Sequence, residues 1–350
     1  ARELMQEHTS RQKERVAAVV LAAGKGTRMG DAGRAKVCHE VAPGRTAIGF
    51  LIEQLRRAGV GLVCVVVGAR AEQVMQDVAD SAPEVLFAYQ RELLGTGHAA
   101  WCGARALVAA GAAETFLIAM GDKMTTAAVV RGLLEQHRHE EADLTFAVSP
   151  RVGESEQGRV VVGEEGRVLG IVEVPDLVAA RAWREIERAF DARASLPAAE
   201  VGAILRAALP PSGKVPKIMR ELLDAAARGG NFTLAEARAL APAARATVTL
   251  AGAELDPDWV EAQAPWVNEA LYAFSARALE RFFASLSFDT AQGEGYLPDA
   301  VAVLASAPEG FVVRAYEVPA GALMGFNTPA ELDQVRESVQ QWLGRQGRGD

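Results

Sequence analysis

Short apolar runs alternate along the first half of the chain with longer segments of helical periodicity. The apolar runs show almost no polar alternation, which is typical of strands buried on both faces of a parallel sheet. They lie at residues 16–23, 62–67, 85–88, 115–120 and 144–148. The helical segments lie between them, at residues 48–59, 71–78, 97–107 and 129–137. Strands that alternate with helices at this interval predict an α/β fold with a mostly parallel sheet and helices on both faces.

The pattern changes in the second half of the chain. Two β-rich runs around residues 164–166 predict a hairpin, and the following segment is rich in Ala, Arg and Glu. Trp183, Ile186 and Phe190 recur there at helical spacing, which favours a helical insertion over a disordered linker. The predicted order is an N-terminal tail at 1–15, a first part of the core at 16–175, the helical insertion at 176–265, and the remainder of the core with a C-terminal helix at 266–350.

A glycine-rich turn follows the first apolar run. Gly24 and Gly26 expose backbone N–H groups with little steric obstruction, and Lys25 and Arg28 add positive charge. Amide dipoles and cations at the end of a buried strand favour the oxygens of a polyphosphate. Ligands of such sheets bind at the carboxyl ends of strands, so Asp122, which also follows a strand, is expected at the same edge.

The spacing of this turn excludes two common nucleotide-binding motifs. A dinucleotide fingerprint, Gly-x-Gly-x-x-Gly, needs glycine where the chain has Met29, and Lys25 does not stand in the frame of a P-loop. An ordinary glycine-rich turn between a strand and a helix remains the alternative reading of the stretch.

Charge and cysteine content narrow the class of protein. The net charge of −8 disfavours a general nucleic-acid or anionic-membrane surface, so a polyanion must bind in a local cationic pocket. Cys38, Cys64 and Cys102 lack metal-type spacing and favour a reducing, cytoplasmic compartment. No run approaches the ~18 apolar residues of a transmembrane helix. The chain begins with Ala1, so we expect a trimmed chain or a fragment of a longer protein.

Several separate motifs resemble one family of enzymes. They are Leu21-Ala-Ala-Gly-Lys-Gly-Thr-Arg-Met29 with Lys36, Gln90-x-x-x-Leu-Gly-Thr-Gly-His-Ala99, Gly121-Asp122, the hairpin from Gly158 to Glu173, Asp289-Thr-Ala-Gln-Gly-Glu-Gly-Tyr296, and Gly325-Phe-Asn327. The first resembles the signature of sugar-1-phosphate nucleotidyltransferases, and the others are similar to segments of bacterial N-acetylglucosamine-1-phosphate uridyltransferase. The resemblance covers roughly residues 16–175 and 266–340, and it implies a Rossmann-like nucleotidyltransferase sheet.

The resemblance implies transfer of UMP from UTP to N-acetylglucosamine-1-phosphate or a related hexose-1-phosphate, with release of pyrophosphate. Two anions meet in this reaction, so catalysis is largely charge neutralisation and in-line positioning. By the family's pattern, Arg28 and Lys36 hold the triphosphate and the attacking phosphate. The nucleotide-binding positions are Leu21, Ala22, Ala23, Gly24, Lys25, Gly26, Gln90, Gly95 and Thr96.

The resemblance also implies a Mg²⁺ cofactor held by Asp122 and Asn327. This ion takes one or two protein oxygens besides phosphate oxygens. Alternatively, Asp122 is a cap at a strand end, and Asn327 is the N-cap of the final helix.

Three further positions match residues that contact the acetamido sugar in the family, namely Gly158, Glu173 and Asn268. A hairpin glycine and a solvated glutamate are the alternative readings of the first two. Asn268 lies among apolar neighbours in a strand and needs polar partners, of which a ligand is one candidate. His39 and His98 are interpreted as structural, because this phosphoryl transfer does not require an acid–base group.

The departures from the family's pattern fall near the metal or the sugar. Lys123-Met124 stands where an apolar residue and proline are usual, Glu269-Ala270 where Thr-Gly is usual, and Pro298 where Thr is usual; the insertion follows Glu173 closely. Lys123 is expected to pair with Asp122 or to contact phosphate.

The nucleotide side of the pattern is intact, so the acceptor is the open question. The expected partners are small molecules, an NTP and a sugar-1-phosphate. One alternative is a nucleotidyltransferase that uses another NTP or a non-sugar phosphate such as phosphocholine. The other is a non-catalytic nucleotide-binding regulatory protein, in which Lys123 and the insertion disable the site.

Overall fold

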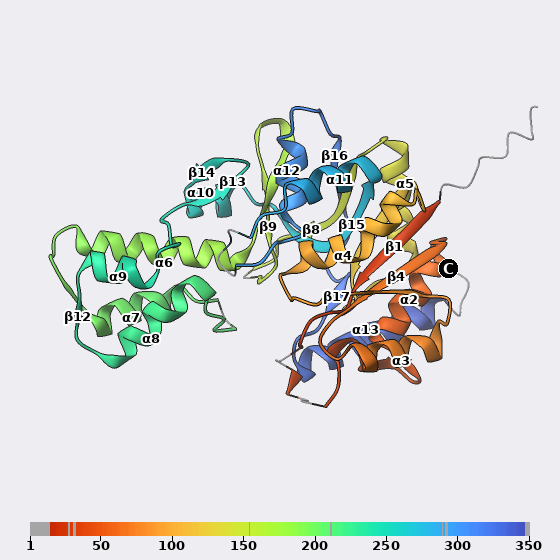
Figure 1. Ribbon diagram of the computed structural model, residues 1–350, viewed down its shortest axis with the longest axis horizontal. Helices are drawn as coiled ribbons and strands as arrows, with labels where there is room; N and C mark the ends of the chain where they lie inside the picture. The colour runs from red at the N-terminus through yellow and green to blue at the C-terminus, as the bar shows by residue number, and fades with distance from the viewer. Residues whose placement is uncertain are drawn as a thin grey trace, which may run out of the picture.

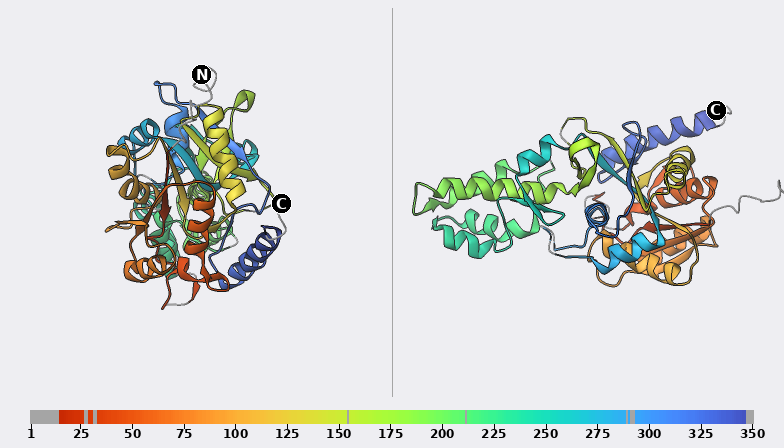
Figure 2. Two further views of the ribbon diagram at one scale, coloured as in Figure 1. Left: turned by 90° about the vertical axis from the view of Figure 1, so that its right-hand side faces the viewer. Right: turned by 90° about the horizontal axis from the view of Figure 1, so that it is seen from above.

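A mixed sheet lies at the centre of the computed structural model, which describes residues 15–26, 29–30, 33–153, 155–210, 212–288, 290 and 293–346 (Figure 1). Within these residues the sheet has nine strands, and all but β10 (Val168–Val172) and β15 (Trp266–Ser275) run in one direction. Helices cover both of its faces (Figure 2). The prediction of a mostly parallel α/β sheet with helices on both faces is therefore confirmed.

Four parallel strands make up the half of the sheet that carries the glycine-rich turn. Their order is β5 (Leu86–Tyr89), β4 (Leu62–Val67), β1 (Val16–Leu21) and β6 (Thr115–Met120). Side chains of β1 alternate between two hydrophobic cores, Val20 on one face and Val19 on the other. Because both faces are covered, these strands need apolar residues at consecutive positions, which explains the runs in the sequence.

The helices divide between the two cores. Those of the first face are α2 (Ala47–Arg57), α3 (Ala71–Ser81), α5 (Ala127–His139) and α13 (Pro329–Gln346). Those of the second face are α4 (Thr96–Ala109), α11 (Ala276–Ala284) and α12 (Asp299–Ala305). In the described part of the chain, no helix combines the length and apolar character needed to cross a bilayer.

Strand β15 connects the parallel half to the remaining strands, β8 (Leu144–Pro150), β9 (Arg159–Val162), β10 and β16 (Val313–Glu317). Its last residues pair with β6 and its first residues with β9, while β8 lies along its other side. Strands β6 and β9 thus follow one another along the same side of β15. The hairpin of β9 and β10 consequently lies beyond the carboxyl end of β6, which is the edge where ligands of such sheets bind.

Two small ladders and two short helices complete the core. They are β2 (Glu40–Ala42) with β3 (Arg45–Thr46), β7 (Lys123–Met124) with β17 (Met324–Gly325), and the 3-10 helices η2 (Lys36–Cys38) and η3 (Glu164–Gly166). The β7–β17 ladder joins the segment after β6 to the segment before α13, which lie two hundred residues apart in sequence.

The insertion projects away from the sheet along its first helix (Figure 1; Figure 2, right). Its helices are α6 (Val174–Phe190), α7 (Ala198–Ala207), η4 (Lys217–Met219), α8 (Arg220–Arg228), α9 (Leu234–Leu240) and α10 (Pro257–Ala262). Trp183, Ile186 and Phe190 enter a hydrophobic core of the insertion itself, as their spacing predicts.

Two features of the insertion differ from the sequence prediction. Its first helix begins at Val174, two residues before the predicted boundary at Asp176. It also contains two small sheets, β11 (Leu196–Pro197) with β12 (Asn231–Phe232) and β13 (Val248–Leu250) with β14 (Ala253–Leu255). Strands of two or three residues are too short to show an alternating pattern in the sequence.

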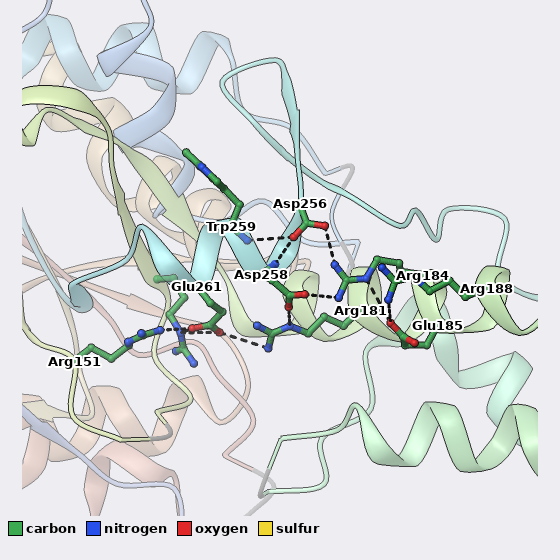
Figure 3. A network of polar contacts seen from close by, with 10 residues as sticks. Arg151, Arg181, Arg184, Glu185, Arg188, Asp256, Asp258, Trp259 and Glu261 are labelled. Atoms are coloured by element: carbon green, nitrogen blue, oxygen red, sulfur yellow. Dashed lines mark hydrogen bonds and ion pairs between the residues drawn. The ribbon is translucent and has the colours of Figure 1, made fainter.

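A network of ion pairs fastens the insertion to the core (Figure 3). Glu261 on α10 pairs with Arg151 and with Arg159 of the core, and also with Arg181 on α6. Further along α6, Arg184 pairs with Asp256 and Asp258. Glu261 therefore pairs with arginines of both the core and the insertion.

Candidate active site

The turn after β1 lies between the ends of the two neighbouring strands. The Leu21 carbonyl accepts a hydrogen bond from the Gly121 N–H, and the Ala23 carbonyl accepts one from the Ala69 N–H. The side chains of Leu21, Ala22 and Ala23 are buried, which leaves their backbone as the part that a ligand can contact.

The glycine-rich part of the turn faces solvent. Gly24 and Lys25 are exposed, and Gly26 has a φ of +61°. A Cβ at Gly26 would lie 2.8 Å from the Cβ of Lys36, so glycine allows the turn to approach that side chain. Arg28, predicted to hold phosphate, lies outside the described residues.

Lys36 connects the two residues predicted to bind the metal. Its ammonium group donates to the Asp122 carboxylate and, at 2.9 Å, to the side-chain oxygen of Asn327. The Lys36 and Asp122 side chains are 13% and 22% exposed, so the cluster is largely shielded from water but reachable. The β7–β17 ladder brings Asp122 and Asn327 together, since Lys123 pairs with Gly325.

This arrangement fits a divalent cation. Side-chain oxygens of Asp122 and Asn327 converge on the Lys36 ammonium group, and oxygens of these two kinds are ligands that Mg²⁺ would accept. The alternative role of Asn327 as a helix N-cap is taken by Thr328, whose hydroxyl accepts a hydrogen bond from the Glu331 N–H.

The residues predicted to read the base also lie together. Gln90 follows β5 and is 3% exposed, and its amide donates to the Gly95 carbonyl and contacts His98, both at 3.1 Å. Gly95 has a φ of +97°, and Thr96 accepts a hydrogen bond from the Leu297 N–H at 2.9 Å. His98 lies in the first turn of α4, as expected for a structural residue.

The three positions predicted to contact the sugar are neighbours beyond the end of β6. The Asn268 N–H donates to the Gly158 carbonyl at 2.9 Å. A Cβ at Gly158 would lie 2.6 Å from Oε1 of Glu173, so this glycine makes room for the carboxylate. The Asn268 amide donates to the Tyr272 hydroxyl at 2.6 Å, and its oxygen accepts from the Ala270 N–H.

Two of the departures from the family's pattern pair with each other. Lys123 forms an ion pair with Glu269 at 2.8 Å, rather than with Asp122, and Ser149 donates to the same carboxylate at 2.7 Å. The Glu269 side chain is only 4% exposed, so each charge needs the other. Complementary unusual residues at two positions are the signal in the sequence that could have indicated the pair.

Sequence reasoning missed a cavity of about 690 Å³ between the core and the insertion. Glu173, Tyr296 and Asp299 line it from the core, and Asp176 on α6 and the β13–β14 hairpin line it from the insertion. Burial and the neighbouring carboxylates raise the pKa of Glu173 to about 7. The same two causes raise the pKa of Asp299 to about 7.

The comparisons with known proteins agree with this geometry. Residues 18–199, just over half of the chain, match the model of the family described as the MobA-like NTP transferase domain.

Curated relatives match about half of the chain. The bifunctional protein GlmU of Pelobacter propionicus is 43% identical over 164 residues, which are 47% of this chain and 35% of that protein. GlmU of Cutibacterium acnes is 38% identical over 183 residues, which are 51% of this chain and 43% of that protein. The chain therefore spans less than half the length of these relatives.

Solved structures share the fold over almost the whole chain. A UDP-glucose pyrophosphorylase in complex with UDP-glucose has a TM-score of 0.57 at 12% identity, over 93% of this chain and 99% of that one. HddC from Yersinia pseudotuberculosis has a TM-score of 0.51 at 15% identity, over 92% and 99%. The fold, the turn after β1 and the match over residues 18–199 lead to one conclusion: the chain belongs to the MobA-like NTP transferase family.

Proposed function

We propose that this protein is a Mg²⁺-dependent nucleotidyltransferase that transfers UMP from UTP to a hexose-1-phosphate related to N-acetylglucosamine-1-phosphate. The observation that carries the proposal is the convergence of Lys36, Asp122 and Asn327 beside the exposed amides of the turn after β1. The relatives named bifunctional protein GlmU and the fold shared with a UDP-glucose pyrophosphorylase support the choice of a sugar phosphate and of UTP.

In the proposed reaction, an oxygen of the sugar-1-phosphate attacks the α-phosphorus of UTP. A new P–O bond forms as the bond to the bridging oxygen breaks, and pyrophosphate leaves with the electron pair. Lys36 would hold phosphate oxygens as charge shifts toward the leaving group, and the amides of Gly24 and Lys25 would orient the triphosphate. Mg²⁺, bound by Asp122 and Asn327, would supply further neutralisation of phosphate charge.

The buried base-reading cluster supports the nucleotide part of the proposal. The Gln90 amide can offer both a donor and an acceptor to the edge of a base. Its burial and its contact with Gly95 hold it in place, so that little ordering remains to be done on binding.

The proposal is tested by measuring pyrophosphate release with UTP, Mg²⁺ and a panel of hexose-1-phosphates. We expect turnover with at least one acceptor, and a loss of about 100-fold or more in the Asp122→Ala variant. Asp224→Ala, an exposed aspartate on α8, is the matched control and should retain wild-type activity.

Two results would contradict the proposal. One is the absence of uridylyl transfer to every hexose-1-phosphate, which would favour another nucleotide, another acceptor or a binding protein. The other is full activity in Asp122→Ala, which would remove this carboxylate from the reaction. Repeating the assay with CTP, ATP and GTP, and with phosphocholine as acceptor, distinguishes the alternative transferases.

A further inference from the structure

The cavity between the core and the insertion lies next to the predicted sugar-contacting residues. Glu173, which lies against Gly158, is part of the cavity wall. The Gly158 carbonyl accepts a hydrogen bond from the Asn268 N–H. The cavity of about 690 Å³ is large enough for a small phosphorylated acceptor. It is therefore the natural place for the part of the acceptor that lies away from the reacting phosphate.

The wall of the cavity has an excess of carboxylates. Glu173, Asp176, Glu254 and Asp299 face two cations, Arg245 and Arg281. Both arginines already have partners. Arg281 pairs with Glu309 at 3.0 Å, and Arg245 donates at 2.8 Å to the backbone carbonyls of residues 242 and 244.

The carboxylates of the cavity wall differ in the hydrogen bonds that they accept. Glu254 accepts hydrogen bonds from Thr247 and, at 2.7 Å, from Thr249. Among the described residues, the Glu173 carboxylate accepts no hydrogen bond, although Lys214 and Arg159 reduce its electrostatic penalty. Arg159 is itself paired with Glu261, so it is not available as a dedicated partner.

A second polar group in the cavity wall also lacks a close partner. Tyr296 is 9% exposed, and within the described residues its buried hydroxyl makes no hydrogen bond of ordinary length and angle. Thr290 lowers the pKa of this hydroxyl, but its own hydroxyl donates to the Glu294 carbonyl at 2.8 Å and accepts from the Glu294 N–H at 3.0 Å. A buried hydroxyl without a partner loses free energy relative to water, so it indicates a ligand that supplies the missing bond.

The raised pKa values of Glu173 and Asp299 agree with a site that binds a cation. Burial and the neighbouring Asp176 raise the pKa of both Glu173 and Asp299, and Asp299 also raises the pKa of Glu173. A positive group placed among them would relieve this repulsion and stabilise the ionised forms. A neutral hydroxyl would leave the repulsion in place.

We propose that this cavity receives the acceptor, and that Glu173 and Asp299 select acceptors that carry an ammonium group in addition to the phosphate. This inference rests on the proposed function and narrows its acceptor. The phosphate lies toward Lys36, while the ammonium group lies between these two carboxylates. The Tyr296 hydroxyl bonds to a polar atom of the same acceptor.

The test compares two matched pairs of ligands that differ in charge and little else. Glucosamine-1-phosphate is compared with glucose-1-phosphate, and phosphoethanolamine with 2-hydroxyethyl phosphate. Binding to the full chain is measured by calorimetry at pH 7, and pyrophosphate release with UTP and Mg²⁺ is measured in parallel. We expect the ammonium-bearing member of at least one pair to bind about tenfold to a hundredfold more tightly.

Variants connect the preference to the carboxylates. Glu173→Gln and Asp299→Asn keep shape and should each reduce the preference to less than about threefold, with the thermal unfolding curve serving as a check on folding. Glu254→Gln is the matched control, because its carboxylate is already bonded to two threonines, and it should keep the preference.

Each outcome is informative. If the neutral member binds as tightly as the charged one in both pairs, or if none of the four ligands binds, the inference is overturned. Turnover of neutral hexose-1-phosphates with equal efficiency would overturn it while leaving the proposed function intact. Selective binding without any nucleotidyl transfer would instead support the cavity and contradict the proposed function.

Discussion

At the end of the site proposed to bind Mg²⁺, the Asp122 carboxylate is matched by the ammonium group of Lys36. At the proposed acceptor end, Glu173 and Asp299 line one cavity, and neither forms an ion pair within the described residues. The charge of Asp122 is therefore already neutralised by a side chain of the protein itself. The cavity at the acceptor end keeps its carboxylates partly protonated near neutral pH. The contrast shows that polar side chains without a partner inside the protein indicate the chemistry of a ligand better than side chains that are already paired.

The largest expected effect is at the compensated end. Lys36→Met removes the positive charge that bridges Asp122 and Asn327, so we expect kcat/KM for nucleotidyl transfer to fall by about 100-fold or more. Steady-state pyrophosphate release measures this. Lys217→Met, an exposed lysine of the insertion, is the control with the same substitution. An unchanged kcat/KM in Lys36→Met would contradict this difference between the two ends of the site. It would show that the Lys36 ammonium group stabilises the fold and takes no part in the reaction.

A smaller effect is expected where the two ends meet, at the ion pair of Lys123 and Glu269. Glu269→Gln leaves the Lys123 ammonium without its carboxylate at a site that is 19% exposed, so we expect the free energy of unfolding to fall by about 1–3 kcal/mol. Denaturant unfolding measures this. The double variant Lys123→Met with Glu269→Gln should recover part of the loss. Full stability in Glu269→Gln alone would show that the pair contributes nothing.

A third effect is a change in pH dependence at the proposed acceptor end. The pKa of Glu173 rises from 4.5 to about 7 on folding. The folded state therefore keeps a proton that the unfolded state loses, and the free energy of unfolding falls as pH rises through this range. In Glu173→Gln this loss is absent, so the variant should gain stability relative to wild type between pH 5 and pH 8, by at most about 3 kcal/mol.

The control for this measurement has the opposite sign. Hydrogen bonds from Thr247 and Thr249 lower the pKa of Glu254, so its contribution to stability is present above its ordinary pKa and lost as pH falls. Glu254→Gln should thus lose stability relative to wild type as pH rises. Parallel curves for both variants, measured by thermal unfolding across the pH range, would contradict the difference between the two carboxylates.

The sequence predicts the two ends of the site unequally. The strands of the parallel half and the turn after β1 could be predicted because each occupies one contiguous stretch of the sequence, an apolar run or the glycines that follow it. Asp122 and Asn327 are identified from motifs that match a family, and their convergence depends on the β7–β17 ladder, whose strands have two residues each. Such a ladder has no periodicity from which it could be predicted.

The acceptor end depends on contacts between distant segments. Lys123 and Glu269 are separated by 146 positions, so their pairing could not be distinguished from a contact of Lys123 with Asp122 or with phosphate. The cavity is formed when the β13–β14 hairpin of the insertion faces Asp299, and neither segment alone carries a signal. The sequence therefore did not predict the contacts between charged residues that are far apart in the chain and that only the fold brings together.

The register of the sheet has a consequence for engineering. Val172, before the insertion, and Val267, after it, both pair with Arg159, one on each side of β9. The two junctions are thus two strand spacings apart, roughly 10 Å. A loop of a few residues is long enough to bridge such a gap. A replacement for the excursion from α6 to α10 must therefore cover Val161 and Val172, which pack against residues of the insertion, rather than span a long distance.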